Sequence, residues 1–206
     1  MKLIIATQNS KKLKELEELL EGLPLKIVSL KESGIEAEEV IEDGKTFWEN
    51  AVKKAMAIAY RTTDWVLGED SGLEVEVLDG APGIFSARFA SVGANRRVTP
   101  NDEENNQKLL ELLKEVPLDK RMACYRCSVA IAYQKKLVGV TEGKCEGTIA
   151  LSPRGNGGFG YDPIFIPKGY QQTFGELGQE VKQKISHRAE AIGKIKGYYF
   201  SWGAMP

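Results

Sequence analysis

The run Trp65–Gly72 constrains the fold most, because it joins an apolar stretch to two adjacent carboxylates. Trp-Val-Leu precedes Gly68, and then come Glu69, Asp70, Ser71 and Gly72. An apolar run bounded by turn residues predicts a buried strand. Open α/β sheets bind ligands at the carboxyl ends of their strands, where these carboxylates are expected to lie. Since successive strand side chains point to opposite faces, we expect the two acids to have different roles. A polar turn between two strands fits the same residues.

Length and charge bound the class of protein. The 206 residues suffice for one sizeable domain or two lobes around a cleft. The net charge of −1 gives no global signal for a nucleic acid or a membrane surface as partner. No apolar run approaches the roughly 20 residues of a membrane span. The strand-like start at 2–6 is too short for a signal peptide, so we expect a cytoplasmic protein.

The three cysteines stand at positions 124, 127 and 145. An odd number of cysteines in a chain of this size does not predict a disulfide framework. Cys124 and Cys127 form a CxxC, but a zinc site needs around four ligands and no second pair follows. We interpret all three as reduced, structural thiols.

Hydrophobic periodicity predicts an α/β fold. Strands are expected at 2–6, 25–30, 65–67, 73–78, 122–133, 137–150 and 164–166, and helices from about residue 10, from Thr46, over 102–116 and after Ser186. The long strands of the hairpin around 134–136 suggest an elongated antiparallel sheet that reaches into a second lobe. The fold expected for the whole chain is α/β, with a mixed, elongated central sheet, helices on its faces and two lobes around a substrate cleft. We expect a single domain over 1–206, loose only at 201–206.

The first predicted helix carries lysines where the helix dipole is positive. Asn9 or Ser10 can cap it, and Lys11, Lys12 and Lys14 follow in its first turn. Cations there are disfavoured by about 0.3–1 kcal/mol each. An anion at this terminus would remove the conflict, because backbone N–H groups and lysines would share it. The alternatives are a phosphate site and a solvated lysine cluster; a GxxxxGK[ST] loop is absent.

Three further stretches are candidate site segments. The glycine-rich run 155–163 carries Phe159 and Tyr161, on which a base could stack at about 1–3 kcal/mol, or which could pack inward. Asp162 could accept hydrogen bonds there. The acidic run 36–44 is a possible cation site or a solvated loop. Thr46 and Glu49 fit a capping box of a helix on which Lys54 is by default a surface lysine.

The last predicted helix repeats the pattern of the first. Ser186 can cap it, and His187 and Arg188 stand at its positive N-terminus. A lone histidine is more often structural than catalytic. The repetition nevertheless favours contact with an anionic or polar ligand.

Together these motifs closely resemble the Ham1-like, or inosine triphosphate pyrophosphatase, family, whose bacterial members are dITP/XTP pyrophosphatases. The resemblance covers almost the whole chain, with the motifs in the family's order. They are ATxN…K at 6–12, TFxENAxxKA at 46–55, EDSGL at 69–73, GAPGIxSAR at 80–88, a GTGGFGYDPIF-like run at 155–165 and K…SHR at 182–188.

The resemblance implies Mg²⁺-dependent hydrolysis of ITP, dITP and XTP to the monophosphate and pyrophosphate, which cleanses the nucleotide pool. It also implies a homodimer and two α/β lobes flanking a cleft. Asp70 matches the catalytic carboxylate, and Asp70 with Glu42 would hold the metal. The substrate-binding residues it implies are Thr7, Gln8, Asn9, Ser10, Lys11, Lys12, Lys54, Ser71, Phe159, Gly160, Tyr161, Asp162, Lys182, His187 and Arg188.

Alternatives remain at the level of both residue and function. Bacterial members usually carry two aspartates where this chain has Glu69-Asp70, so either acid could orient the attacking water. A Maf-like nucleotide pyrophosphatase is a rival enzyme, although it lacks the SHR ending. A nucleotide-binding sensor without turnover is the rival from another class.

Overall fold

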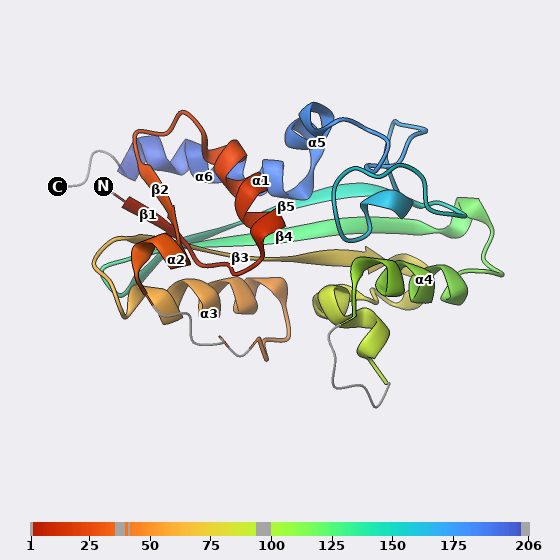
Figure 1. Ribbon diagram of the computed structural model, residues 1–206, viewed down its shortest axis with the longest axis horizontal. Helices are drawn as coiled ribbons and strands as arrows, with labels where there is room; N and C mark the ends of the chain where they lie inside the picture. Colours follow the sequence, from red (N-terminus) through yellow and green to blue (C-terminus); the bar gives the residue numbers. More distant parts are fainter. Residues whose placement is uncertain (1, 36–39, 41, 94–99, 203–206) are drawn as a thin grey trace. The chain divides into compact units, whose positions relative to one another are not determined.

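A mixed six-stranded sheet forms the framework of the protein. The computed structural model describes residues 2–35, 40, 42–93 and 100–202, with side chains up to 197 (Figure 1). The strand order is β2-β1-β3-β4-β5-β6. β1 pairs in parallel with β2 and β3, and β5 pairs antiparallel with β6. The strands are β1 Lys2–Ile5, β2 Lys26–Ser29, β3 Trp65–Val75, β4 Met122–Tyr133, β5 Lys136–Ile149 and β6 Phe165–Pro167.

Helices and short 3₁₀ turns connect the strands. The α-helices are α1 Ser10–Leu20, α2 Leu30–Ser33, α3 Phe47–Ala59, α4 Asp102–Leu112, α5 Gln179–Ile185 and α6 His187–Trp202. The 3₁₀ segments are η1 Glu76–Leu78, η2 Gly83–Ser91, η3 Leu118–Lys120 and η4 Asp162–Ile164. The predicted mixed α/β class is confirmed. Among the described residues, no helix has the length and apolar character needed to cross a membrane.

The chain divides into two compact units. The first unit comprises 1–70, 127–143 and 187–206, and the second comprises 71–126 and 144–186. The long strands β3, β4 and β5 contribute residues to both. Each unit has its own apolar core.

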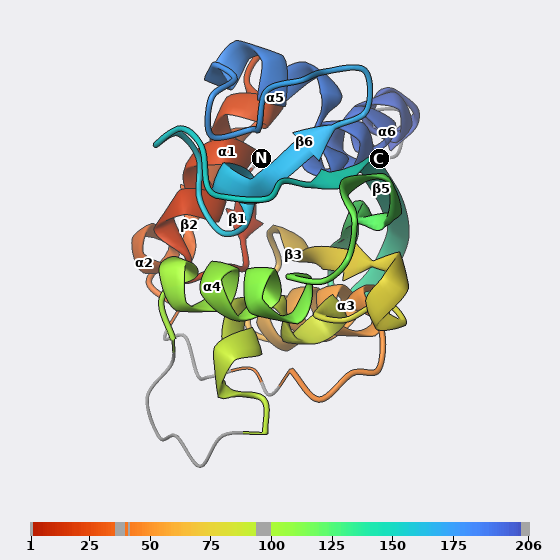
Figure 2. The same ribbon diagram turned by 90° about the vertical axis from the view of Figure 1, so that its right-hand side faces the viewer.

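The first unit buries both faces of its strands. On one face, Leu67 of β3 packs with leucines of α1 and with Ile192 of α6. On the other face, Val66 packs with Ala51 and Ala55 of α3. Both views place α3 on the opposite side of these strands from α1 and α6 (Figures 1 and 2). Alternation along β3 therefore directs neighbouring side chains to different helices.

A glycine sets how closely α3 approaches β3. A Cβ at Gly68 would lie 2.4 Å from the carbonyl oxygen of Ala51 and 2.5 Å from the backbone nitrogen of Ala55. Only a residue without a side chain allows this contact. Two residues further along the same strand face, Asp70 also points toward α3.

The second unit is built around aromatic rings. Tyr125 of β4 meets Phe165 edge-on, with ring centroids 4.7 Å apart, and Phe165 stacks on Phe174 at 5.5 Å. Leu109 and Leu113, in and just after α4, are fully buried in the same core. This core supports the glycine-rich loop that precedes η4.

The strand predictions differ from the structure at two points. β3 runs without interruption from Trp65 to Val75, so the two carboxylates lie inside the strand and not at its carboxyl end. Its parallel pairing with β1 does end at Leu67, directly before Gly68. The predicted strand 73–78 finishes as the 3₁₀ turn η1, and 25–30 ends in the short helix α2. The hairpin is confirmed: Gln134 and Lys135 between β4 and β5 have φ of +47° and +64°, as a two-residue turn requires.

The helix predictions need smaller corrections. The helix predicted over 102–116 ends at Leu112, which is 49% exposed. Thr46 caps α3 as predicted, but the Glu49 carboxylate accepts from the backbone N–H of Lys45, so the reciprocal half of the box is not made with Thr46. The end predicted to be loose is helical through Trp202, and 203–206 lie outside the described residues.

Candidate active site

Asp70 is a buried carboxylate held by two groups of α3. It is 5% exposed, and its Oδ1 lies 2.8 Å from Nζ of Lys54. Its Oδ2 accepts a hydrogen bond of 3.2 Å from Nδ2 of Asn50. Burial raises the pKa of Asp70, although the charges of Lys54 and Lys12 act in the opposite direction. The carboxylate is therefore desolvated and depends on nearby positive charge.

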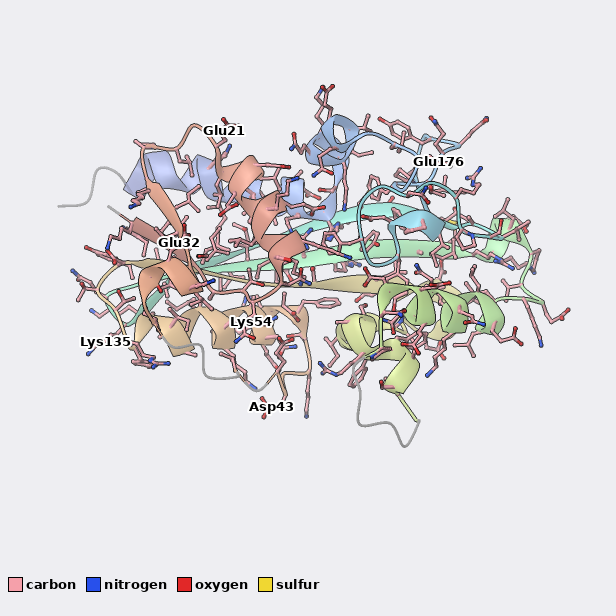
Figure 3. All side chains as sticks on the ribbon, viewed as in Figure 1. Glu21, Glu32, Asp43, Lys54, Lys135 and Glu176 are labelled. Carbon is pink, nitrogen blue, oxygen red and sulfur yellow. The ribbon has the colours of Figure 1, made fainter. Side chains whose placement is uncertain are left out.

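Lys54 lies between two acids. Its Nζ is 2.8 Å from Asp70 and 3.0 Å from Oε1 of Glu42, and the side chain is 13% exposed. Burial would lower the pKa of Lys54, but Asp70, Glu42 and Glu69 together raise it. Figure 3 labels Lys54 on α3. The expectation that Lys54 is a surface lysine is wrong. The periodicity of its helix could not show that Glu42 and Asp70, which belong to two other segments, would lie beside it.

This arrangement fits a hard divalent cation. Asp70 and Glu42 converge on one ammonium group, so the same two carboxylates can converge on one metal ion. Mg²⁺ takes oxygen ligands and keeps several waters, and one or two carboxylates with substrate phosphates suffice. Within the described residues, no three His, Cys, Asp or Glu side chains form a metal group. Residues 36–39 and 41 of the acidic run lie outside those residues.

Glu69 belongs to a different cluster, on the face of α1 and α6. Its carboxylate lies 2.9 Å from Nζ of Lys12 and 2.9 Å from Nη2 of Arg188. Arg188 also forms an ion pair with Glu15 of α1. The pKa of Arg188 is raised: burial opposes the charged form, but the charges of Glu69 and Glu15 outweigh it. Two acids and two bases thus sum to zero charge in a buried position, which limits the cost of burying them.

The predicted phosphate loop is capped from within. Oδ1 of Asn9 accepts from the backbone N–H groups of Lys11 and Lys12, at 3.0 and 3.1 Å. These two backbone N–H groups already have an acceptor. This differs from the sequence-based expectation that they would be shared with a bound anion. Glu69 supplies part of the negative charge that Lys12 requires. Lys11, Gln8 and Ser10 remain exposed, as does Asn9, and Thr7 is half-buried.

In the second unit, Asp162 organises the glycine-rich loop. Its Oδ2 lies 2.6 Å from Nζ of Lys182 and accepts from the backbone N–H of Phe159 at 2.8 Å. Tyr125 donates to its Oδ1 at 3.4 Å. Lys182 also lies 4.7 Å from the centre of the Phe159 ring. The structure thus brings together the half-buried ring of Phe159 and the buried ion pair of Asp162 with Lys182.

Tyr161 does not extend the aromatic surface. It is 3% exposed, packs in the apolar core and donates to the carbonyl oxygen of Ser86 at 2.8 Å. Burial raises the pKa of its phenol. The half-buried Phe159 is therefore the aromatic ring of this loop that a base could reach, and Gly160 beside it is also half-buried. Ser71 is half-buried in the second unit, and His187 is buried at the start of α6.

Sequence reasoning missed Asn50 and Glu15. Both are buried polar residues in helices, at 1% and 7% exposure, and both hold a predicted site residue. An asparagine among alanines in a helix interior is a weak signal, because asparagine favours caps and turns over helix interiors. Glu15, a glutamate in a leucine-rich helix, gives no sequence signal, since its partner Arg188 lies 173 residues away.

Comparison with known proteins identifies the family. The model of the Ham1 family matches residues 3–198. This chain belongs to the Ham1 family. A relative from Desulforamulus reducens, named dITP/XTP pyrophosphatase, is 49% identical over 195 residues, which cover 94% of this chain and 93% of the relative. One from Bacillus subtilis with the same name is 44% identical over 192 residues, covering 93% of each.

A solved structure has the same fold. The Ham1 protein of Staphylococcus aureus superposes with a TM-score of 0.84 at 34% identity, covering 98% of this chain and 100% of that one. The predicted resemblance to this family is confirmed.

Proposed function

We propose that this chain hydrolyses the non-canonical purine nucleoside triphosphates ITP, dITP and XTP to the monophosphate and pyrophosphate, and so cleanses the nucleotide pool. Family membership and the names of the relatives support this function. The observation that carries it is the group of Asp70, Lys54 and Glu42, in which two acids share one cation. A binding sensor would not need a desolvated carboxylate at this position.

The first unit carries the groups proposed for the triphosphate. Lys12 and Lys54 offer ammonium groups that offset charge developing on the pyrophosphate leaving group, which is the main task in phosphoryl-type transfer. The exposed residues of the loop 7–11 are proposed to contact phosphate as well. Asp70 and Glu42 would hold Mg²⁺, which would supply further positive charge to the phosphates.

Asp70 is proposed as the catalytic carboxylate. Its Oδ2 bond to Asn50 and its ion pair with Lys54 hold it in one orientation. From there it can accept a proton from, or orient, the attacking water. Glu69 faces the other side of β3, where it pairs with Lys12 and Arg188, so this task is not assigned to it.

The residues proposed to recognise the base are Phe159, Gly160, Asp162, Lys182 and Ser71 of the second unit and His187 and Arg188 of the first. A flat purine can stack on Phe159. A donor such as His187 or Arg188 would favour a 6-oxo group, because a 6-amino group there would leave a buried donor unpaired. Arg188 would act from a fixed position, since Glu69 and Glu15 hold its guanidinium.

One assay tests the function: release of pyrophosphate, with Mg²⁺, from ITP, XTP, dUTP, methylated-base triphosphates and ATP. Release confined to ITP and XTP supports the proposal. Release from dUTP or methylated-base triphosphates would favour the Maf-like rival, and binding without release would favour a sensor.

We also propose that the protein forms a homodimer and is located in the cytoplasm. Sedimentation would test the first proposal and cell fractionation the second.

A further inference from the structure

Asn50 of α3 links two separate parts of the candidate site. Its Oδ1 accepts from the backbone N–H of Gly44 at 2.9 Å, and its Nδ2 donates to Oδ2 of Asp70 at 3.2 Å. The side chain is 1% exposed. Gly44 closes the acidic run that contains Glu42, and Asp70 belongs to β3. One buried amide therefore connects the segments that contribute both carboxylates around Lys54.

The chemistry of the amide fixes its direction. A backbone N–H can only donate, so the oxygen of the Asn50 amide must face Gly44. Its NH₂ group must then face Asp70, which accepts. Neither end can be reversed without opposing two donors or two acceptors in a buried place, which would leave buried polar groups unsatisfied.

The contact at Gly44 needs a glycine. A Cβ there would lie 2.4 Å from Oδ1 of Asn50 and 2.9 Å from Cβ of Glu49. Gly44 can therefore approach α3 this closely only because it has no side chain. Asn50 occupies one oxygen of Asp70, and Lys54 lies at the other.

We propose that Asn50 is a positioning residue that orients the Asp70 carboxylate and, through Gly44, holds Glu42 beside it. It leaves Oδ1 of Asp70 directed to the cation between the two acids. This inference deepens the proposed function and rests on it. Asn50 itself has no reacting atom to offer, so it acts through the two carboxylates.

Two substitutions test the link from opposite ends. Asn50→Ala removes both hydrogen bonds, whereas Gly44→Ala pushes the amide from its far end without touching Asp70. We expect each to lower kcat for ITP by about tenfold or more, the effect of losing a hydrogen bond to a charged group. KM should change less than threefold, because the proposed phosphate lysines are untouched. Isothermal titration with Mn²⁺ alone should show weaker binding in both variants.

Asn105 provides a matched control. It is nearly as buried, at 3% exposure, and its side-chain amide also forms hydrogen bonds at both ends, with the backbone of Ala87 and Ala90. Its partners include no carboxylate. Asn105→Ala should therefore lose stability as Asn50→Ala does, but retain wild-type kcat and Mn²⁺ affinity.

Should Asn50→Ala not fold, Asn50→Asp keeps the shape and the acceptor for Gly44. It turns an oxygen toward Asp70, so kcat should again fall. Wild-type kcat and Mn²⁺ affinity in a folded Asn50 variant would overturn the proposal. Failure of the wild-type chain to release pyrophosphate from ITP would refute the proposed function instead, and Mn²⁺ titration would still test the role of Asn50.

Discussion

Glu69 and Asp70 are adjacent in sequence, yet they bind cations on opposite faces of β3. Glu69 pairs with Lys12 and Arg188 on the side of α1 and α6, and Asp70 pairs with Lys54 on the side of α3. The period of two along a strand produces this separation. Each acid therefore has its own electrostatic surroundings, and replacing one should not reproduce the loss of the other.

Asp70→Asn should abolish turnover while the fold remains. The amide keeps the shape of the side chain but cannot accept a proton from water or hold a cation as a carboxylate does. Pyrophosphate release from ITP and a thermal unfolding curve measure the two properties separately. Asp119→Asn, at an exposed aspartate of the second unit, is the control. A near-wild-type rate in Asp70→Asn would show that Asp70 is not the catalytic carboxylate.

Glu69→Gln should lower stability and leave turnover in place, the opposite of the result expected for Asp70→Asn. It removes one of two acids that neutralise Lys12 and Arg188, so a buried positive charge loses its partner. Breaking a buried ion pair costs about 3–5 kcal/mol, which urea unfolding would detect. Turnover at saturating ITP should persist in the fraction that is folded. If kcat instead falls as far as in Asp70→Asn, Glu69 takes part in the chemistry.

Lys54→Met separates metal binding from phosphate binding. Lys54 competes with a metal ion for Asp70 and Glu42, because its ammonium lies within 3.0 Å of both. We expect Mn²⁺ to bind the variant without nucleotide at least about tenfold more tightly than the wild type, since one opposing charge is removed. Inorganic tripolyphosphate should bind more weakly. Lys53→Met, on the same helix but paired with Asp43, should change neither value.

Removal of the metal gives a complementary result. Chelation with EDTA should stop pyrophosphate release by the wild type, and added Mg²⁺ should restore it. The chain should stay folded throughout, because Lys54 pairs with both carboxylates and reduces their mutual repulsion in the absence of metal. Unfolding on chelation would indicate a structural metal site instead.

The sequence predicts local features well and distant pairings poorly. Asn9 and Thr46 cap the helices they precede, because a capping side chain acts within three residues. The alternation that separates Glu69 from Asp70 also follows from local geometry. The pairing of Arg188 with Glu69 does not follow from local geometry, since 119 residues separate the two in sequence. A helix terminus with lysines predicts an anion, but not that the protein supplies one itself.

Asp162 and Lys182 form a second buried pair whose contribution can be measured. Their side chains are 2% and 4% exposed, and 2.6 Å separates the charged atoms. Lys182→Met or Asp162→Asn alone should destabilise the chain by about 3–5 kcal/mol, because the remaining charge stays buried. The double variant should lose less than the sum of the two. The KM for ITP should rise in each, as the Phe159 loop loses its support. Additive losses would show that the two charges act independently.

Cys127 tests the burial of the Glu69 cluster without a substitution. Its side chain is 1% exposed, and burial, with the charge of Glu69 as a smaller cause, raises the pKa of the thiol well above its usual range. The thiolate is the reactive form, so iodoacetamide should not modify Cys127 in the folded chain at pH 8, and the rate should rise only as the pH approaches the raised pKa. The half-buried Cys124 should react first, although burial raises its pKa too. Peptide mass mapping resolves the sites, and urea should expose all three cysteines. Rapid modification of Cys127 in the native chain would mean that this cluster opens to water.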